Sequence, residues 1–310
     1  MTKETNHNEI DLNTNTSEVV AVEESHGVTH EATLYAEHIG DIGPMPVTNA
    51  LFTSWIVVGV IVIFALVLKF KIKQVPRGIQ NFFEFVIDGA MSLADQVTGD
   101  RKISEKAFPM VFPVFIFILL SNWMGILPLG GFGLLEQTDH GQAFIPLIRS
   151  GTADINGNLA LALISILGAN IFGIISIGLW KTINKYVNLN ALGSIFTKIK
   201  KDPIIILTAP IMFAIGFLEL IGEFAKIASL SFRLFGNVFA GEVLLASMAA
   251  VLAYAVPIPF LILEVFVGVI QAFIFAILTL VYYTIASQDH EDHDEHEDHS
   301  KTVQDGAVAH

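Results

Sequence analysis

The sequence predicts an all-α integral membrane protein, with five membrane-crossing helices and one amphipathic helix lying in the membrane interface. Its 310 residues are 53% hydrophobic and only 15% charged. The mean hydropathy of +0.62 is too high for an ordinary soluble domain. Three uncharged apolar runs are each near or above the ~17–25 residues that cross a bilayer as a helix. These runs occupy residues 50–68, 107–135 and 158–180.

A fourth apolar region, residues 204–288, predicts two more helices joined as a hairpin. Pro257 and Pro259 divide it, because proline removes a backbone donor and clashes with the preceding turn. The first arm, 204–255, would be roughly 75–80 Å long at 1.5 Å per residue, whereas the hydrocarbon core is roughly 30 Å thick. We therefore expect a strongly tilted hairpin with a protein partner beside it.

Basic residues set the expected orientation, because cytoplasmic loops are enriched in lysine and arginine. The outer loop, 130–157, contains Arg149 as its one basic residue. We expect the N-terminus outside and the C-terminus in the cytoplasm. The segments after the first and third runs are basic and carry Lys69, Lys71, Lys73 and Arg77, and Lys181, Lys185, Lys198, Lys200 and Lys201.

The segment "VPRGIQNFFEFVIDGAMSLADQV", residues 75–97, has the spacing of an amphipathic helix. Apolar residues recur at intervals of three and four, which places them on one helical face. We predict that this helix lies in the interface rather than spanning the membrane. Its apolar positions are Ile79, Phe82, Phe83, Val86, Ala90, Leu93 and Val97.

Both tails are acidic and are expected to be solvated and disordered: residues 1–45 outside the membrane and the His-rich residues 289–310 in the cytoplasm. Residues 46–288 then form the membrane domain. The net charge of −13 argues against a nucleic-acid partner. Because the chain has no cysteine, thiol redox and cysteine-based zinc sites are excluded. We expect no metal or cofactor, although the histidines at every third tail position are a composition that can bind Zn²⁺ loosely.

Several ionisable residues interrupt the last apolar region, where a charge costs roughly 2.5–3.5 kcal/mol or more to bury. At 100° per residue, four polar side chains fall within about 40° of Arg233 on the first arm. These are Glu219, Lys226, Ser229 and Asn237, with Glu223 close by in sequence.

Glu242 falls about 180° from Arg233 and must meet a different partner. On the second arm, Glu264 and Gln271 are seven residues apart and nearly aligned, and Tyr282 follows on the same side. The two arms thus carry two polar stripes. Each of these residues also has a purely structural interpretation. The acids can pair with Lys226, Arg233 can snorkel or pair with a neighbouring carboxylate, and the amides can form interhelical hydrogen bonds.

Arginine keeps its proton at any relevant pH, so Arg233 can repel or pair with a charge but cannot relay protons. The carboxylates on either side of it can both accept and donate protons. The chain lacks an acid in a small, mobile, glycine-rich hairpin that would carry protons past the arginine. That carboxylate is therefore expected to belong to another subunit.

Two segments of the hairpin, "SLSFRLFGNVFAGE" and "LILEVFVGVIQAFIFAILTLVYYTIA", closely resemble the a subunit of F-type ATP synthases. The resemblance runs from about residue 45 to 288 and includes "VPRGIQNFFEFVID" and "LLSNWMGILP". It implies a proton-translocating stator subunit whose tilted hairpin lies against a rotor ring. The implied partners are the c-ring, the b-type peripheral stalk and, indirectly, the F1 sector.

The resemblance also implies roles for individual residues. Arg233 would be the essential arginine that faces the ring carboxylate and separates two offset half-channels. Family members often have histidine at the position of Glu264. The outer half-channel would be lined by Asn237, Glu242, Glu264 and Gln271, with Asn122 and Asp154 near its mouth. Glu219 would mark the cytoplasmic half-channel, with Glu223 or Lys226 as further contributors. Ser229 and Tyr282 would be further residues of the proton pathway.

On this interpretation the chain is a non-catalytic channel subunit in a bacterial plasma membrane. It lacks the GxxxxGK[ST] phosphate loop, so ATP chemistry would occur in other subunits. The alternative is an ion-coupled secondary transporter or antiporter, which would have an internal repeat and a self-contained site. An intramembrane hydrolase is disfavoured, because all ten histidines lie in the tails or the outer loop.

Overall fold

The structure is a computed structural model that describes residues 36–71, 78–127, 133–138, 141–180, 182, 205–251 and 256–287. Within these residues it is almost entirely helical, and five helices are long and apolar enough to cross a membrane. The predicted all-α membrane fold is confirmed. The helices are α1 (Asn49–Lys71), α2 (Ile79–Thr98), α3 (Arg101–Ile126), α4 (Ile155–Ile177), α7 (Ile205–Val251) and α8 (Pro257–Ser287).

The second predicted run, 107–135, is misplaced at both ends. The helix α3 begins earlier, at Arg101, because the Asp100 side chain caps it by accepting a hydrogen bond from Lys102 N at 2.8 Å. It stops at Ile126, where Leu127 is extended, as expected of a residue that precedes proline.

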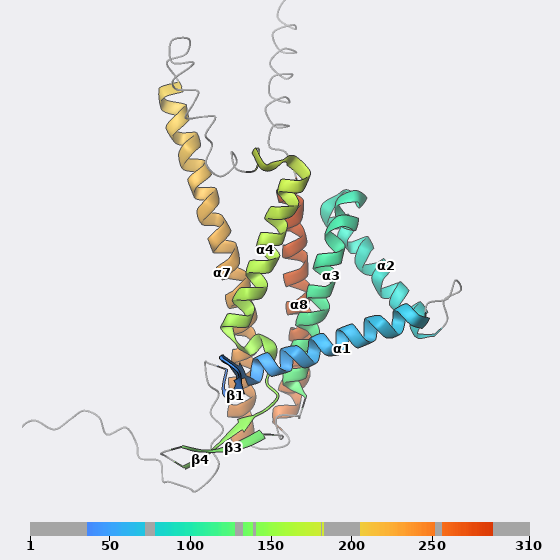
Figure 1. Cartoon of the computed structure of the whole chain (residues 1–310), viewed down its shortest axis with the longest axis vertical. Coiled ribbons are helices and arrows are strands. Elements are labelled where there is room, and N and C mark those ends of the chain that lie inside the picture. Colours follow the sequence, from blue (N-terminus) through green and yellow to red (C-terminus); the bar gives the residue numbers. More distant parts are fainter. Residues whose placement is uncertain are drawn as a thin grey trace, which may run out of the picture.

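Two antiparallel β-hairpins were not predicted from the sequence. The strand β1 (His38–Ile42) pairs with β2 (Met45–Thr48), directly before α1. The strand β3 (Gly133–Thr138) pairs with β4 (Gly141–Pro146) in the loop between α3 and α4. Both hairpins lie near the end of the molecule where α7 finishes and α8 begins (Figure 1).

Four helices, α3, α4, α7 and α8, form the main bundle (Figure 1). The helix α1 runs across their direction, and α2 packs on α3 and α8. The 47 residues of α7 correspond to about 70 Å of helix, so its N-terminal half extends well past α8. The long proline-separated hairpin is thus present, formed by α7 and α8.

The bundle core is apolar and joins all four helices. Its buried side chains come from α3, α4, α7 and α8, so it fixes the hairpin against the two earlier helices. In an 18-residue apolar stretch of α1 and of α7, only 11% of the residues are buried, whereas 28% are buried in the corresponding stretches of α3, α4 and α8. The helix α7 therefore leaves much of its apolar surface uncovered. The core residues are Val114, Ile118, Ala162, Ile166, Leu230, Leu234, Ala272 and Phe275.

Candidate functional site

Arg233 lies in the middle of α7, between core residues and the uncovered surface. Its neighbours Leu230 and Leu234 are fully buried, whereas Arg233 itself is half-buried. Its Nη2 donates to Ser229 Oγ, one turn earlier, at 3.5 Å. Among the described residues it forms no ion pair with an acid. The guanidinium is thus not paired with any carboxylate of the described part of its own chain.

Four of the predicted residues gather on one side of Arg233, toward the β-hairpins. They line one cavity of about 30 Å³, which is large enough for a water molecule. The rest of its lining is small or apolar and consists of Gly125, Ile126, Ser150, Val238, Leu245 and Gly268. We call the four the carboxylate cluster: Asn122, Asn237, Glu242 and Glu264.

Arg149 is the partner of Glu242. Its Nη2 lies 2.7 Å from Glu242 Oε2, and its Nε is 3.2 Å from both carboxylate oxygens. The Arg149 side chain is only 8% exposed and that of Glu242 is 26% exposed. Sequence reasoning missed this pair, although two signals pointed to it. Arg149 was the one basic residue of the outer loop, and Glu242 needed a partner away from the Arg233 face.

Asn122 holds the loop that carries Arg149 against the bundle. Its Nδ2 donates to Gly268 O at 3.2 Å, and its Oδ1 accepts from Thr152 Oγ1 at 2.6 Å. Ser150 Oγ donates to Ser121 O at 3.0 Å. Since buried polar groups are costly to leave unpaired, these bonds fix the short helix η2 (Gly151–Ala153) against α3 and tie α3 to α8.

Gly241 lets α7 and α8 approach closely at the same cavity. A Cβ built at this position would overlap the carboxylate of Glu264. A side chain larger than hydrogen therefore requires Glu264 to move. The glycine is a requirement of the site that the sequence reasoning did not recognise.

A second polar group lies on the other side of Arg233. Lys226 Nζ is 2.7 Å from Glu223 Oε1 and 5.2 Å from the centre of the Tyr282 ring. Asn170 Nδ2 of α4 donates to Glu223 Oε2 at 3.5 Å. Asn170 was not predicted from the sequence. These four residues line a common small pocket, and we call them the lysine cluster.

The apolar core separates the two clusters. Along α7, Leu230 and Leu234 come between Lys226 and Asn237, and along α8, Ala272 and Phe275 come between Glu264 and Tyr282. Gln271 is buried at this level, and its Nε2 has no hydrogen-bond partner among the described residues. Apolar core side chains thus lie between the two clusters, which are eleven residues, about three helical turns, apart along α7.

Five predicted residues line neither cavity: Ser229, Arg233 and Gln271, described above, and Asp154 and Glu219. Asp154 caps α4, accepting a hydrogen bond from Asn156 N at 3.1 Å. Glu219 is half-buried on α7, one turn before Glu223. The His-rich tail, residues 289–310, lies outside the described residues, as do residues 1–35 of the acidic N-terminal tail.

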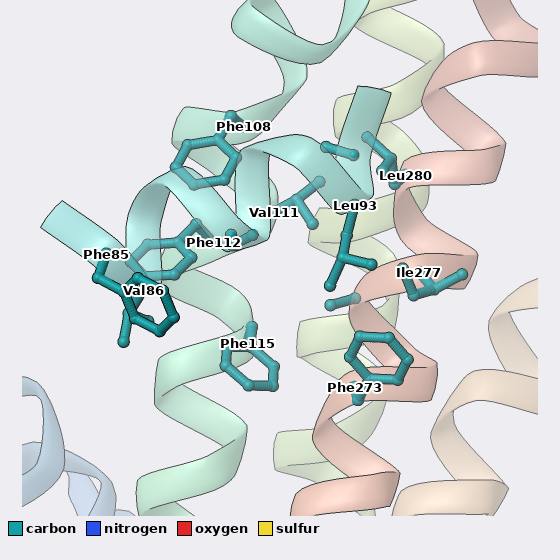
Figure 2. A pocket seen from close by; sticks show the side chains of 14 residues that line it. Phe85, Val86, Leu93, Phe108, Val111, Phe112, Phe115, Phe273, Ile277 and Leu280 are labelled. Carbon is teal, nitrogen blue, oxygen red and sulfur yellow. The ribbon is translucent and has the colours of Figure 1, made fainter. Parts of the chain in front are cut away.

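A larger cavity, of about 330 Å³, lies between α2, α3 and α8 and has a different character (Figure 2). Its labelled side chains, including Phe112, Phe115 and Phe273, are all hydrocarbon. Because an ion loses its hydration without compensation in such surroundings, this cavity is unsuited to proton or ion passage.

Known proteins resemble this chain over most of its length. The family model for the ATP synthase A chain matches residues 51–284. The chloroplastic ATP synthase subunit a of Stigeoclonium helveticum is 34% identical over 243 residues, 78% of this chain and 85% of the relative. ATP synthase subunit a of Gloeobacter violaceus is 31% identical, over 81% of this chain and 88% of the relative. That of Mycobacterium bovis is 34% identical, over 80% and 90%. With the five apolar helices and the polar hairpin, these matches establish that the chain belongs to the ATP synthase A chain family, the subunit a proteins of ATP synthase.

Proposed function

We propose that this chain is the proton-translocating stator subunit of an F-type ATP synthase, in which Arg233 separates two offset half-channels. The observation that carries the proposal is the arrangement along α7: a polar cluster on each side of Arg233, with an apolar core between them. Neither cluster extends through the bundle. A proton that enters one of them must therefore leave the chain before it reaches the other.

The proposed carrier between the clusters is a carboxylate of a c-ring subunit that passes Arg233. The guanidinium has no acidic partner within the described chain, and the apolar face of α7 around it is uncovered. Exposed apolar side chains on this helix, including Phe224 and Phe232, suit a second membrane protein. The Gln271 amide nitrogen, buried and without a hydrogen-bond partner among the described residues, is a further donor that a water molecule would satisfy.

In this mechanism a proton enters from outside through the carboxylate cluster, with Asn237, Glu242, Glu264 and Gln271 along the path and Asn122 and Asp154 near the mouth. It neutralises a ring carboxylate, which can then rotate into lipid. After nearly a full turn the proton leaves on the cytoplasmic side, along Glu219, Glu223 and Lys226, with Ser229 and Tyr282 nearby. Arg233 favours the ionised ring carboxylate and blocks the direct leak. The membrane potential supplies roughly 2.3 kcal/mol per charge per 100 mV.

The chain is proposed to be non-catalytic by itself, with ATP chemistry in the F1 sector and the b-type peripheral stalk holding the stator. We propose a bacterial plasma-membrane location, with the N-terminus outside and the C-terminus in the cytoplasm, on the basis of the basic segments around α1 and α4.

Proton uptake by lipid vesicles tests this function. Vesicles containing the chain together with a c-ring should take up protons when a potential is applied, whereas vesicles containing the chain alone should not. A secondary transporter would conduct without the ring. Equal uptake in the two preparations would therefore contradict the stator role.

A further inference from the structure

The ion pair between Arg149 and Glu242 gives different roles to the two carboxylates of the outer cavity, Glu242 and Glu264. We propose that Arg149 is a positioning residue that keeps Glu242 ionised, so that Glu264 is the carboxylate that carries the proton through the outer cavity. The inference rests on the proposed function, because it assigns roles within the same half-channel.

The geometry distinguishes the two acids. Glu242 receives three contacts of 2.7–3.2 Å from the guanidinium, which engages both of its carboxylate oxygens. Arg149 is nearly buried and engages both oxygens of Glu242, which is the geometry of a charge-assisted arginine–carboxylate pair. Glu264 lines the same cavity but has no ion pair among the described residues. It is half-buried and shares the cavity with Glu242.

Two ionised carboxylates in one small cavity repel each other, so the site favours a single negative charge. With Arg149 fixed on Glu242, that charge resides on Glu242, and the incoming proton binds an oxygen of Glu264. It then passes to water or to the ring carboxylate, and Glu264 is ready for the next proton. Arg149 cannot compete, because it does not release its own proton.

The position of Arg149 is fixed by its surroundings. Its backbone N donates to Thr53 Oγ1 of α1 at 3.2 Å, and the following residues are tied down by Asn122 and Ser121. Glu37 is a further acid at this end of the described chain, and its carboxylate accepts from Asn49 Nδ2 at 3.4 Å. The backbone of Arg149 is thus held from α1 and α3, and its nearly buried side chain is held by the contact with Glu242.

The test is the pH dependence of potential-driven proton uptake by vesicles that contain the whole membrane sector. Arg149→Gln leaves two like charges facing each other, so the pair should retain a proton to higher pH. We expect the pH midpoint of uptake to rise by about 1–3 units and the rate at alkaline pH to fall. The double variant Arg149→Gln with Glu242→Gln removes both charges of the pair. It should restore the wild-type midpoint, because Glu264 remains.

Glu264→Gln should lower uptake by on the order of 100-fold, both in the wild type and in the double variant.

Arg101→Gln is the matched control, because it removes another arginine–carboxylate contact of 2.7 Å, to Asp95, outside the cavity. It should leave the pH profile unchanged. Copurification of the ring reports assembly. If Arg149→Gln does not assemble, the double variant still carries the test, because it leaves no buried charge unpaired.

An unchanged midpoint in Arg149→Gln would overturn the proposal. So would a double variant as inactive as Glu264→Gln, because Glu242 would then be the carrier. These outcomes differ from a failure of the proposed function itself, in which wild-type vesicles would not take up protons at all.

Discussion

Substitution of Gly241 by alanine tests the geometry of the outer cavity without removing a charged or polar group. The added Cβ would overlap the Glu264 carboxylate, which is the flexible end of a side chain rather than backbone. Glu264 must therefore retreat by about 1 Å or more, and misplacement of that size at a reacting group costs on the order of 100-fold in rate. We expect proton-coupled ATP synthesis to fall by about 10- to 100-fold.

Assembly should survive this substitution. Alanine is favoured over glycine within a helix by about 0.5–1 kcal/mol, and an off-rotamer Glu264 costs about 0.5–1.5 kcal/mol. The two effects nearly offset each other. The loss of function should therefore appear in complexes that contain normal amounts of the ring.

The assay is ATP synthesis by purified complexes reconstituted in vesicles under an imposed pH gradient and potential. Gly59→Ala in α1 is the control, because a Cβ at that position meets no atom within 4 Å. Its activity should equal that of the wild type. Normal activity of Gly241→Ala in the same assay, with Glu264→Gln inactive, would refute the close approach of α7 and α8 at this cavity.

Three further predictions concern stability and pH. Gly125→Ala places a Cβ 2.6 Å from Ser150 Cβ and 3.1 Å from its Cα, so we expect it to destabilise the protein by about 1–3 kcal/mol in thermal unfolding in detergent; an unchanged unfolding temperature would contradict the packing. Asn122→Ala removes the hydrogen bonds that Asn122 makes with Gly268 O and with the Thr152 hydroxyl, and each lost bond should cost about 0.5–1.5 kcal/mol, which denaturant titration would measure. The Arg101 guanidinium holds the pKa of Asp95 below its ordinary value of 3.8, so the stabilisation is present at neutral pH and is lost as the pH falls below that value. Arg101→Gln should therefore lower the unfolding temperature at pH 7 but not at about pH 2, and an equal difference at both would exclude the charge interaction as its cause.

Hydropathy and proline positions were sufficient to predict the fold class, because a bilayer allows few solutions for an apolar chain. They located the hairpin break at Pro257 and the interfacial helix at Ile79–Thr98 to within a few residues. They misplaced both ends of α3, because its charged first turn is held by a cap and its apolar C-terminal continuation precedes a proline. The β-hairpins were missed because β3 begins inside the apolar run 107–135, and the other strands lie outside every run and are only 4 to 6 residues long.

The candidate site was predicted only in part, because helical spacing describes one helix at a time. Helical spacing places Arg233, Asn237 and the acids of α7 relative to one another, but it does not say which other element meets each face. Arg149 and Asn170 join the clusters from a loop and from α4, through contacts between residues far apart in sequence. Gly241 matters only because α8 brings Glu264 to it. Such tertiary contacts leave no periodic signal in one sequence.

If a fixed cation on α7 keeps two half-channels apart and meets a carboxylate of another subunit, coupled synthesis requires Arg233. The decisive measurement is proton-driven ATP synthesis by the complete complex carrying Arg233→Ala. We expect no coupled synthesis in complexes that retain the ring. Synthesis at the wild-type rate by those complexes would contradict the proposed role of Arg233.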